Sequence, residues 1–272
     1  MADFQLKFIL RETSSRARKI ALTHLPTSEK EAYELIIQRI RERTAFTLNS
    51  VVLPVLSWVY HAKRLLTLDE MRELLDFRDG NSPDEGSEEE DVGDDFMTSC
   101  ESLITHEESS GVLRFCHATV REWLPESTIW NDLLSPVEIA KICLNHLDQD
   151  EFDEPCIDRQ SLRQRQEMYK LSDYTSKYWH QHVRDVEHDA SVQDQVLKTF
   201  MSQNKRVSIL QLADSWLNDP TDDPTHLRLS LLHVICQHGL TVICAAFHDR
   251  GFDIDDLYIS ISGVTNFKAS SS

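Results

Sequence analysis

The chain has 272 residues, of which 40% are hydrophobic and 27% charged, with only 7 Gly and 8 Pro. Such a composition excludes collagen-like, disordered and disulfide-scaffold proteins, and the length suffices for about one to three domains. The formal charge of −18 repels nucleic-acid phosphates and anionic lipids, so it disfavours both as partners.

The first half of the chain predicts amphipathic helices with clear start signals. Ser28 and Glu31 form a capping box ahead of an apolar stripe. A broad apolar run over residues 48–59 predicts a helix that contacts protein on both sides, in which Pro54 fits only the first turn or a kink. Thr67–Glu70 is a second capping box and predicts the start of the next helix.

Residues 79–95 carry nine carboxylates and no basic side chain. Like charges at this density predict a disordered surface loop, with a docking segment for a basic partner as the alternative. Beyond it, a β-hairpin is expected from strands at 103–105 and 112–117, where apolar and polar residues alternate, joined by a turn at Glu108–Gly111.

The second half returns to helical periodicity. One helix is expected from Ala118 up to Pro125, and Ser135 with the following Pro and Glu138 marks the start of another. Further amphipathic runs fall at 171–178, 192–200 and 209–217, and helical spacing predicts that their aromatic residues belong to the core. These aromatic residues include Tyr169, Tyr174, Tyr178 and Trp179.

Residue patterns also indicate the cellular compartment and whether the chain spans a membrane. Six cysteines without a Cys-x-x-Cys pair, mostly on apolar helical faces, indicate a reducing compartment, and the charged N-terminal residues lack a secretory signal. Uncharged stretches at 44–62 and 230–248 are interrupted by Pro54 or Gly239 and contain polar residues, so membrane spans are not expected. A cytoplasmic protein with no membrane partner is predicted.

Three helices followed by a hairpin is the order of a winged helix. The segment Leu56–Met71 (LSWVYHAKRLLTLDEM) resembles the winged-helix segment that follows the NACHT nucleotidase in fungal NLR-like proteins. The hairpin exit at 114–124 (RFCHATVREWL) is similar to the same family, and further likenesses at 25–40, 139–144 and 171–179 extend the resemblance to about residues 18–220.

Near the C-terminal end, residues 230–240 (SLLHVICQHGL) and 242–255 resemble one degenerate ankyrin repeat. Ser230 and His233 are expected to satisfy the first helix's N-terminal amides, and Gly239 and Gly251 to adopt positive φ. A single repeat cannot bury its own face, so it either leans on the preceding helices or stays loosely ordered.

These observations together predict a mostly α fold, a helical bundle with a winged-helix unit that carries the β-hairpin and a terminal ankyrin-like helix pair. The expected parts are an N-terminal helical segment (1–44), a winged-helix-like domain (45–130), a helical domain (131–220), an ankyrin-like repeat (225–257) and a tail (258–272).

No catalytic, cofactor-binding or metal-binding residue is predicted. The phosphate-binding loop G-x-x-x-x-G-K-[ST] that drives NACHT proteins is missing from the sequence, so no nucleotide cofactor is expected. His180 and His182, with His188 beyond them, would diverge on a helix rather than share a metal. Cys116 and His117 would face opposite sides of a strand, which makes His117 a packing or capping residue.

The predicted function is therefore that of a non-enzymatic regulatory or protein-interaction module, which could serve as an adaptor, a decoy or a truncated relic. A protein is the expected partner, and the resemblance implies a NACHT-bearing relative. The alternative is a winged-helix nucleic-acid-binding regulator, against which the acidic outer faces of 68–77 and 95–104 argue. The carboxylates assigned to those faces are Asp69, Glu70, Glu73, Asp76 and Glu101.

Overall fold

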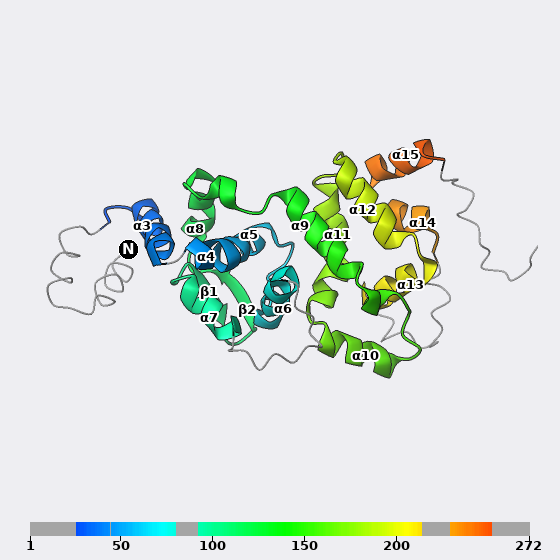
Figure 1. Ribbon diagram of the computed structural model, residues 1–272, viewed down its shortest axis with the longest axis horizontal. Helices are drawn as coiled ribbons and strands as arrows, with labels where there is room; N and C mark the ends of the chain where they lie inside the picture. Colours follow the sequence, from blue (N-terminus) through cyan, green and yellow to red (C-terminus); the bar gives the residue numbers. More distant parts are fainter. Residues whose placement is uncertain (1–25, 44, 80–91, 214–228, 252–272) are drawn as a thin grey trace, which may run out of the picture. The chain divides into compact units, whose positions relative to one another are not determined.

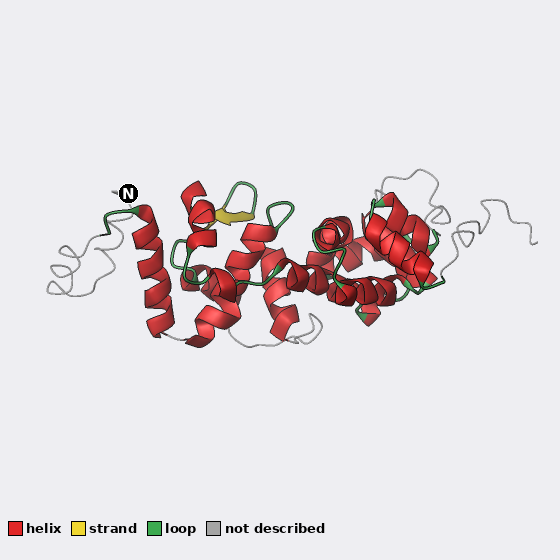
Figure 2. Ribbon diagram, turned by 90° about the horizontal axis from the view of Figure 1, so that it is seen from above, coloured by secondary structure: helices red, strands yellow, loops and turns green. Residues whose placement is uncertain are grey.

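The computed structural model describes residues 26–43, 45–79, 92–213 and 229–251. These residues are mostly helical and contain one two-stranded antiparallel sheet, which confirms the expectation of a mostly α chain with one small hairpin (Figures 1 and 2). They form two compact units, one up to Leu75 and from 92 to Leu134, the other from Ser135 onward together with the few residues that follow Leu75.

The first unit contains helices, the hairpin and short 3-10 turns. Its elements are α3 (Glu29–Arg43), α4 (Ala45–Thr47), a π-helical turn (Leu48–Val52), α5 (Leu53–His61), α6 (Leu68–Asp79, whose last residues are grouped with the second unit), α7 (Val92–Ser99), β1 (Ile104–Glu107), β2 (Val112–Phe115), α8 (Ala118–Trp123) and 3-10 turns at Leu124–Glu126 and Trp130–Asp132.

Helix α3 begins at the predicted capping residue. Ser28 Oγ accepts a hydrogen bond from the Glu31 amide at 3.2 Å, while the Glu31 carboxylate accepts from the Thr27 amide at 2.7 Å, one residue further back than a standard capping box requires. The Tyr33 hydroxyl lies 2.8 Å from Thr119 Oγ1 at the start of α8. Residues 29–43, set apart above as an N-terminal segment, thus pack within the first unit.

Pro54 lies where a π-helical turn passes into α5. In that turn the Leu53 amide donates to the Leu48 carbonyl, five residues back, and Pro54 then occupies the first turn of α5. Because proline has no amide hydrogen and its ring clashes with the carbonyl four residues earlier, the wider turn accommodates it. Every residue from Leu53 to Val59 is buried, as expected for a helix covered on both sides.

The hairpin is confirmed, with β1 pairing antiparallel to β2 from Ile104 opposite Phe115 to Glu107 opposite Val112. Gly111 closes its turn at φ +70°. On its other edge β2 accepts the residues that precede α6: the Leu113 amide donates to the Leu66 carbonyl at 2.8 Å.

The predicted acidic loop is shorter than 79–95. Helix α6 extends to Asp79 and α7 begins at Val92, so both ends of the expected loop are helical. Residues 80–91, like 1–25, 214–228 and 252–272, lie outside the described residues.

The second unit is built from helices. They are α9 (Pro136–Leu147), α10 (Arg159–Met168), α11 (Leu171–Arg184), α12 (Ala190–Phe200), α13 (Gln203–Ala213), α14 (Leu231–Gln237) and α15 (Thr241–Asp249), with a 3-10 turn at Asp150–Phe152. Helix α9 starts at the complete capping box of Ser135 and Glu138. Helix α10 was not predicted, because Leu162 is its single buried residue and gives no apolar stripe.

Aromatic side chains form the core of the second unit, as predicted. Tyr169, Tyr174 and Trp179 are at most 6% exposed, and Trp179 packs on Phe200 of α12 with ring centroids 4.4 Å apart. Tyr178 is half-buried and stacks on Tyr174. In the described part of the chain, the helices are too short or too polar for any of them to span a bilayer.

Candidate functional site

The terminal helix pair, α14 and α15, forms through the local signals that the sequence predicts. Ser230 Oγ accepts from the His233 amide at 3.2 Å and starts α14, and Gly239 at φ +66° turns the chain into α15. Gly251 ends α15 at φ +88°. One side of the pair is apolar, and its side chains are buried. They are Leu231, Leu232, Val234, Ile235, Leu240, Ile243 and Phe247.

Polar contacts join this pair to the preceding helices, so of the two expected outcomes the pair packs on its neighbours and is not loosely ordered. The carboxylate of Glu187, which is 7% exposed, accepts from the Val242 amide at 2.8 Å near the start of α15. The Arg184 guanidinium donates to the His238 carbonyl at the end of α14. Arg206 of α13 donates to the Leu229 carbonyl at 3.0 Å.

The two histidines of α11 make different contacts. His180 stacks on His238, with ring centroids 4.0 Å apart and planes 14° apart, whereas His182 Nε2 lies 2.7 Å from the Tyr174 hydroxyl in the core. His188 is exposed. The three residues of the rejected metal hypothesis are therefore not brought together, and no cluster of three His, Cys, Asp or Glu able to hold a metal occurs among the described residues.

Burial sets the charge state of the stacked rings. It lowers the pKa of His180 to about 4, with further lowering by the positive charges of His238 and Arg184. Burial and Arg184 also lower the pKa of His238. Both imidazoles are consequently neutral near pH 7, which allows two rings beside an arginine to stack without mutual repulsion.

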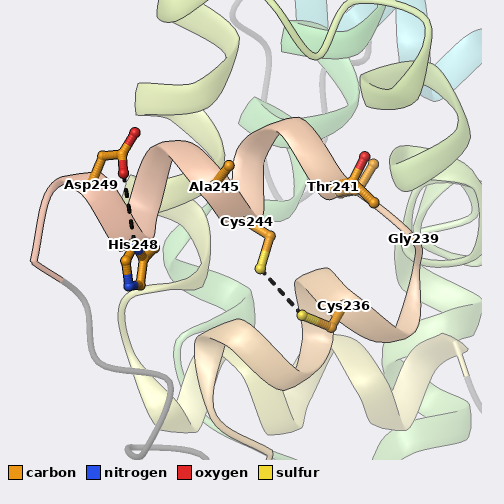
Figure 3. Close-up of a pocket in the computed structure, with 8 residues that line it drawn as sticks. Cys236, Gly239, Thr241, Cys244, Ala245, His248 and Asp249 are labelled. Atoms are coloured by element: carbon orange, nitrogen blue, oxygen red, sulfur yellow. Dashed lines mark hydrogen bonds and ion pairs between the residues drawn. The ribbon is translucent and has the colours of Figure 1, made fainter.

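A largely apolar groove of about 450 Å³ runs along α15 beside the end of α14 (Figure 3). Thr241, Ala245 and His248 line it and are exposed, as is Cys236 of α14. Cys236 Sγ faces Cys244 Sγ of α15 across 3.3 Å. The groove is thus an accessible apolar surface with two adjacent thiols.

Sequence reasoning missed this thiol pair. The signal was present, because Cys236 and Cys244 lie on either side of the Gly239 turn at distances that bring them together in an antiparallel helix pair. The expectation that most of the cysteines lie on apolar helical faces as small hydrophobes concealed this pair. That interpretation is right for Cys100, Cys143 and Cys156, which are buried.

The other pair considered from sequence, Cys116 and His117, has a structural role for its histidine. His117 Nδ1 accepts from the Thr119 amide at 3.3 Å and caps α8, one of the two roles predicted for it. The neighbouring Cys116 is exposed.

The acidic outer face expected at residues 68–77 and 95–104 is partly wrong. Glu70 and Glu101 are 4% and 3% exposed, so they do not belong to an outer face. Arg64 binds Glu70 through two hydrogen bonds, at 2.8 and 2.5 Å, and Arg39 lies 3.6 Å from Glu101. Burying a carboxylate requires such a partner, and the sequence distance between Arg39 and Glu101 concealed it.

No protein-family model, curated protein or solved structure matches the chain. The resemblance to NACHT-associated segments and to an ankyrin repeat remains an expectation from sequence.

Proposed function

We propose that the protein is a non-enzymatic regulatory module that binds another protein, and that the groove along α15 receives an apolar helical segment of that partner. The groove carries this proposal, since its lining is largely apolar and most of its lining residues are exposed, while the inner side of the helix pair is buried.

The way in which helical repeats stack supports a helical partner. In repeat arrays each helix pair buries one face on the pair before it and offers the other to the next pair. Residues that flank α14 and α15 already contact the preceding helices. His238 packs on Trp179 of α11, Arg250 pairs with Asp194 of α12, and the Leu229 carbonyl accepts from Arg206 of α13. A helix pair from a second protein would take the place of the next repeat.

The resemblance of residues 18–220 favours a NACHT-bearing relative as this partner, with the present chain as an adaptor or a decoy. We place the encounter in the cytoplasm, a reducing compartment that suits six thiol cysteines. No substrate or cofactor enters this proposal.

The test uses the purified full chain and the P-loop-bearing relative from the source genome that is most similar to residues 18–220. Ala245→Arg places a charge in the groove and is expected to raise the Kd at least about tenfold, the size of one lost interface contact. Ala190→Arg is the matched control, because Ala190 is an exposed alanine of α12 outside the groove. Equal binding by the wild type and Ala245→Arg, or no binding by the wild type, would refute the proposal.

The nucleic-acid alternative has one structural observation in its favour. Helices α5, α6 and α7 precede the β1–β2 hairpin in the order of a winged helix, with Thr67 paired to Val112 along the edge of β2 opposite β1. The formal charge of −18 argues against it. Retardation of a random DNA duplex by the full chain in a gel-shift assay at physiological salt would favour the alternative.

A further inference from the structure

We infer that Cys236 and Cys244 form a redox-active dithiol, which a low-molecular-weight disulfide such as oxidised glutathione converts to an intramolecular disulfide. This inference goes beyond the docking proposal and is measured with no partner present.

The geometry favours coupling of these two thiols. Their sulfurs are 3.3 Å apart on facing helices, and a disulfide bond of about 2.05 Å needs an approach of little more than 1 Å. Cys236 is exposed and Cys244 is half-buried, and both line the groove, so a small reagent can reach them.

The groove offers a suitable place for the reagent. It is about 450 Å³ in volume and opens beside both sulfurs, with Thr241, Ala245 and His248 as neighbours. A reagent that enters the groove therefore meets two adjacent thiols.

The reaction proceeds by two thiol–disulfide exchanges. Cys236 loses its proton to solvent, and its thiolate attacks one sulfur of oxidised glutathione, forming a mixed disulfide and releasing one glutathione thiolate. Cys244 then loses its proton and attacks the Cys236 sulfur, which releases the second glutathione thiolate. Two protein thiols are oxidised, one glutathione disulfide is reduced to two thiols, and the released thiolates take up the two protons.

The order of attack follows from the surroundings of each thiol. Burial, the hydrogen bond with Cys236 and the charge of Cys236 all raise the pKa of Cys244. Since the thiolate is the nucleophile, the more exposed Cys236 reacts first, and the second step accelerates as the pH rises.

The inference is tested on the full chain incubated with oxidised glutathione, quenched with acid and alkylated, followed by intact mass and non-reducing peptide mapping. We expect Cys236 and Cys244 to be recovered as one cross-linked peptide without bound glutathione, and dithiothreitol to reverse the cross-link. Cys116, another exposed thiol outside the groove, is followed in the same digest and is expected to stay out of the cross-link.

Two variants separate the steps. Cys244→Ser is expected to trap glutathione on Cys236, and Cys116→Ser to leave the cross-link unchanged. Alkylation of both groove cysteines after oxidation, stable glutathione adducts on both, or cross-links to other cysteines would each overturn the inference.

Discussion

Replacing Glu70 tests whether a buried ion pair holds α6 in the first unit. Its carboxylate accepts from the Thr67 amide at 2.8 Å and from Arg64 at 2.8 and 2.5 Å, and the residue is 4% exposed. Glu70→Ala removes a helix cap, which costs about 1 kcal/mol, and leaves Arg64 without this carboxylate. Loss of one partner of a fully buried pair costs about 3–5 kcal/mol.

The expected cost lies at the lower end of this range because the Arg64 side chain is 28% exposed. In the variant its guanidinium can hydrogen-bond to water in place of the lost carboxylate. We therefore expect a total loss of about 3 kcal/mol in the free energy of unfolding for Glu70→Ala. Glu70→Gln keeps an acceptor for the Thr67 amide but removes the charge, so a loss of about 1–2 kcal/mol is expected.

A double-mutant cycle with Arg64→Met isolates the pair. Urea unfolding followed by tryptophan fluorescence, with hydrogen exchange of α6 amides to assign the transition to the first unit, should give a coupling energy of about 1–2 kcal/mol. Asp69→Asn is the matched control, because Asp69 is exposed and its pair with Arg72 should contribute less than about 1 kcal/mol. A coupling energy below about 0.3 kcal/mol, or an equal loss in the control, would refute the reasoning.

Two further predictions concern the terminal helix pair. The pKa of His180 is about 4 against an ordinary 6.5, so the unfolded chain binds a proton that the folded chain does not as the pH falls through this window. The free energy of unfolding should therefore fall from about pH 6.5 towards pH 4, and His180→Asn should flatten this dependence in urea midpoints measured across the range. The exposed His188 gives the matched control, His188→Asn. An unchanged slope in His180→Asn would contradict the burial assigned to His180. Gly239→Ala should destabilise the pair by about 1–2 kcal/mol, because alanine is strained at positive φ. An added Cβ would lie 3.7 Å from the Arg184 guanidinium, which is an ordinary contact, so the loss of stability comes from backbone conformation and not from a clash. Hydrogen exchange of the α14 and α15 amides measures this loss. Exchange equal to that of the wild type would contradict the prediction.

The sequence alone determined the features that depend on neighbours within about four residues. The Ser135 capping box, the Gly111 turn of the hairpin and the Gly239 turn of the terminal pair were all predicted and are present. Their hydrogen bonds join residues that are adjacent in the chain, so residue type and spacing are sufficient to specify them.

Tertiary structure decided the features whose partners are distant or whose local signal is weak. Glu101 is buried beside Arg39, the Val242 amide binds Glu187, and His180 stacks on His238, across sequence separations that no helical period encodes. Helix α10 lacked an apolar stripe, and its identity as a helix rests on the Asp158 cap and its packing. For the thiol pair in the groove, the spacing of the two cysteines about the Gly239 turn is compatible with a contact, but the 3.3 Å approach of the sulfurs depends on how α15 packs along α14.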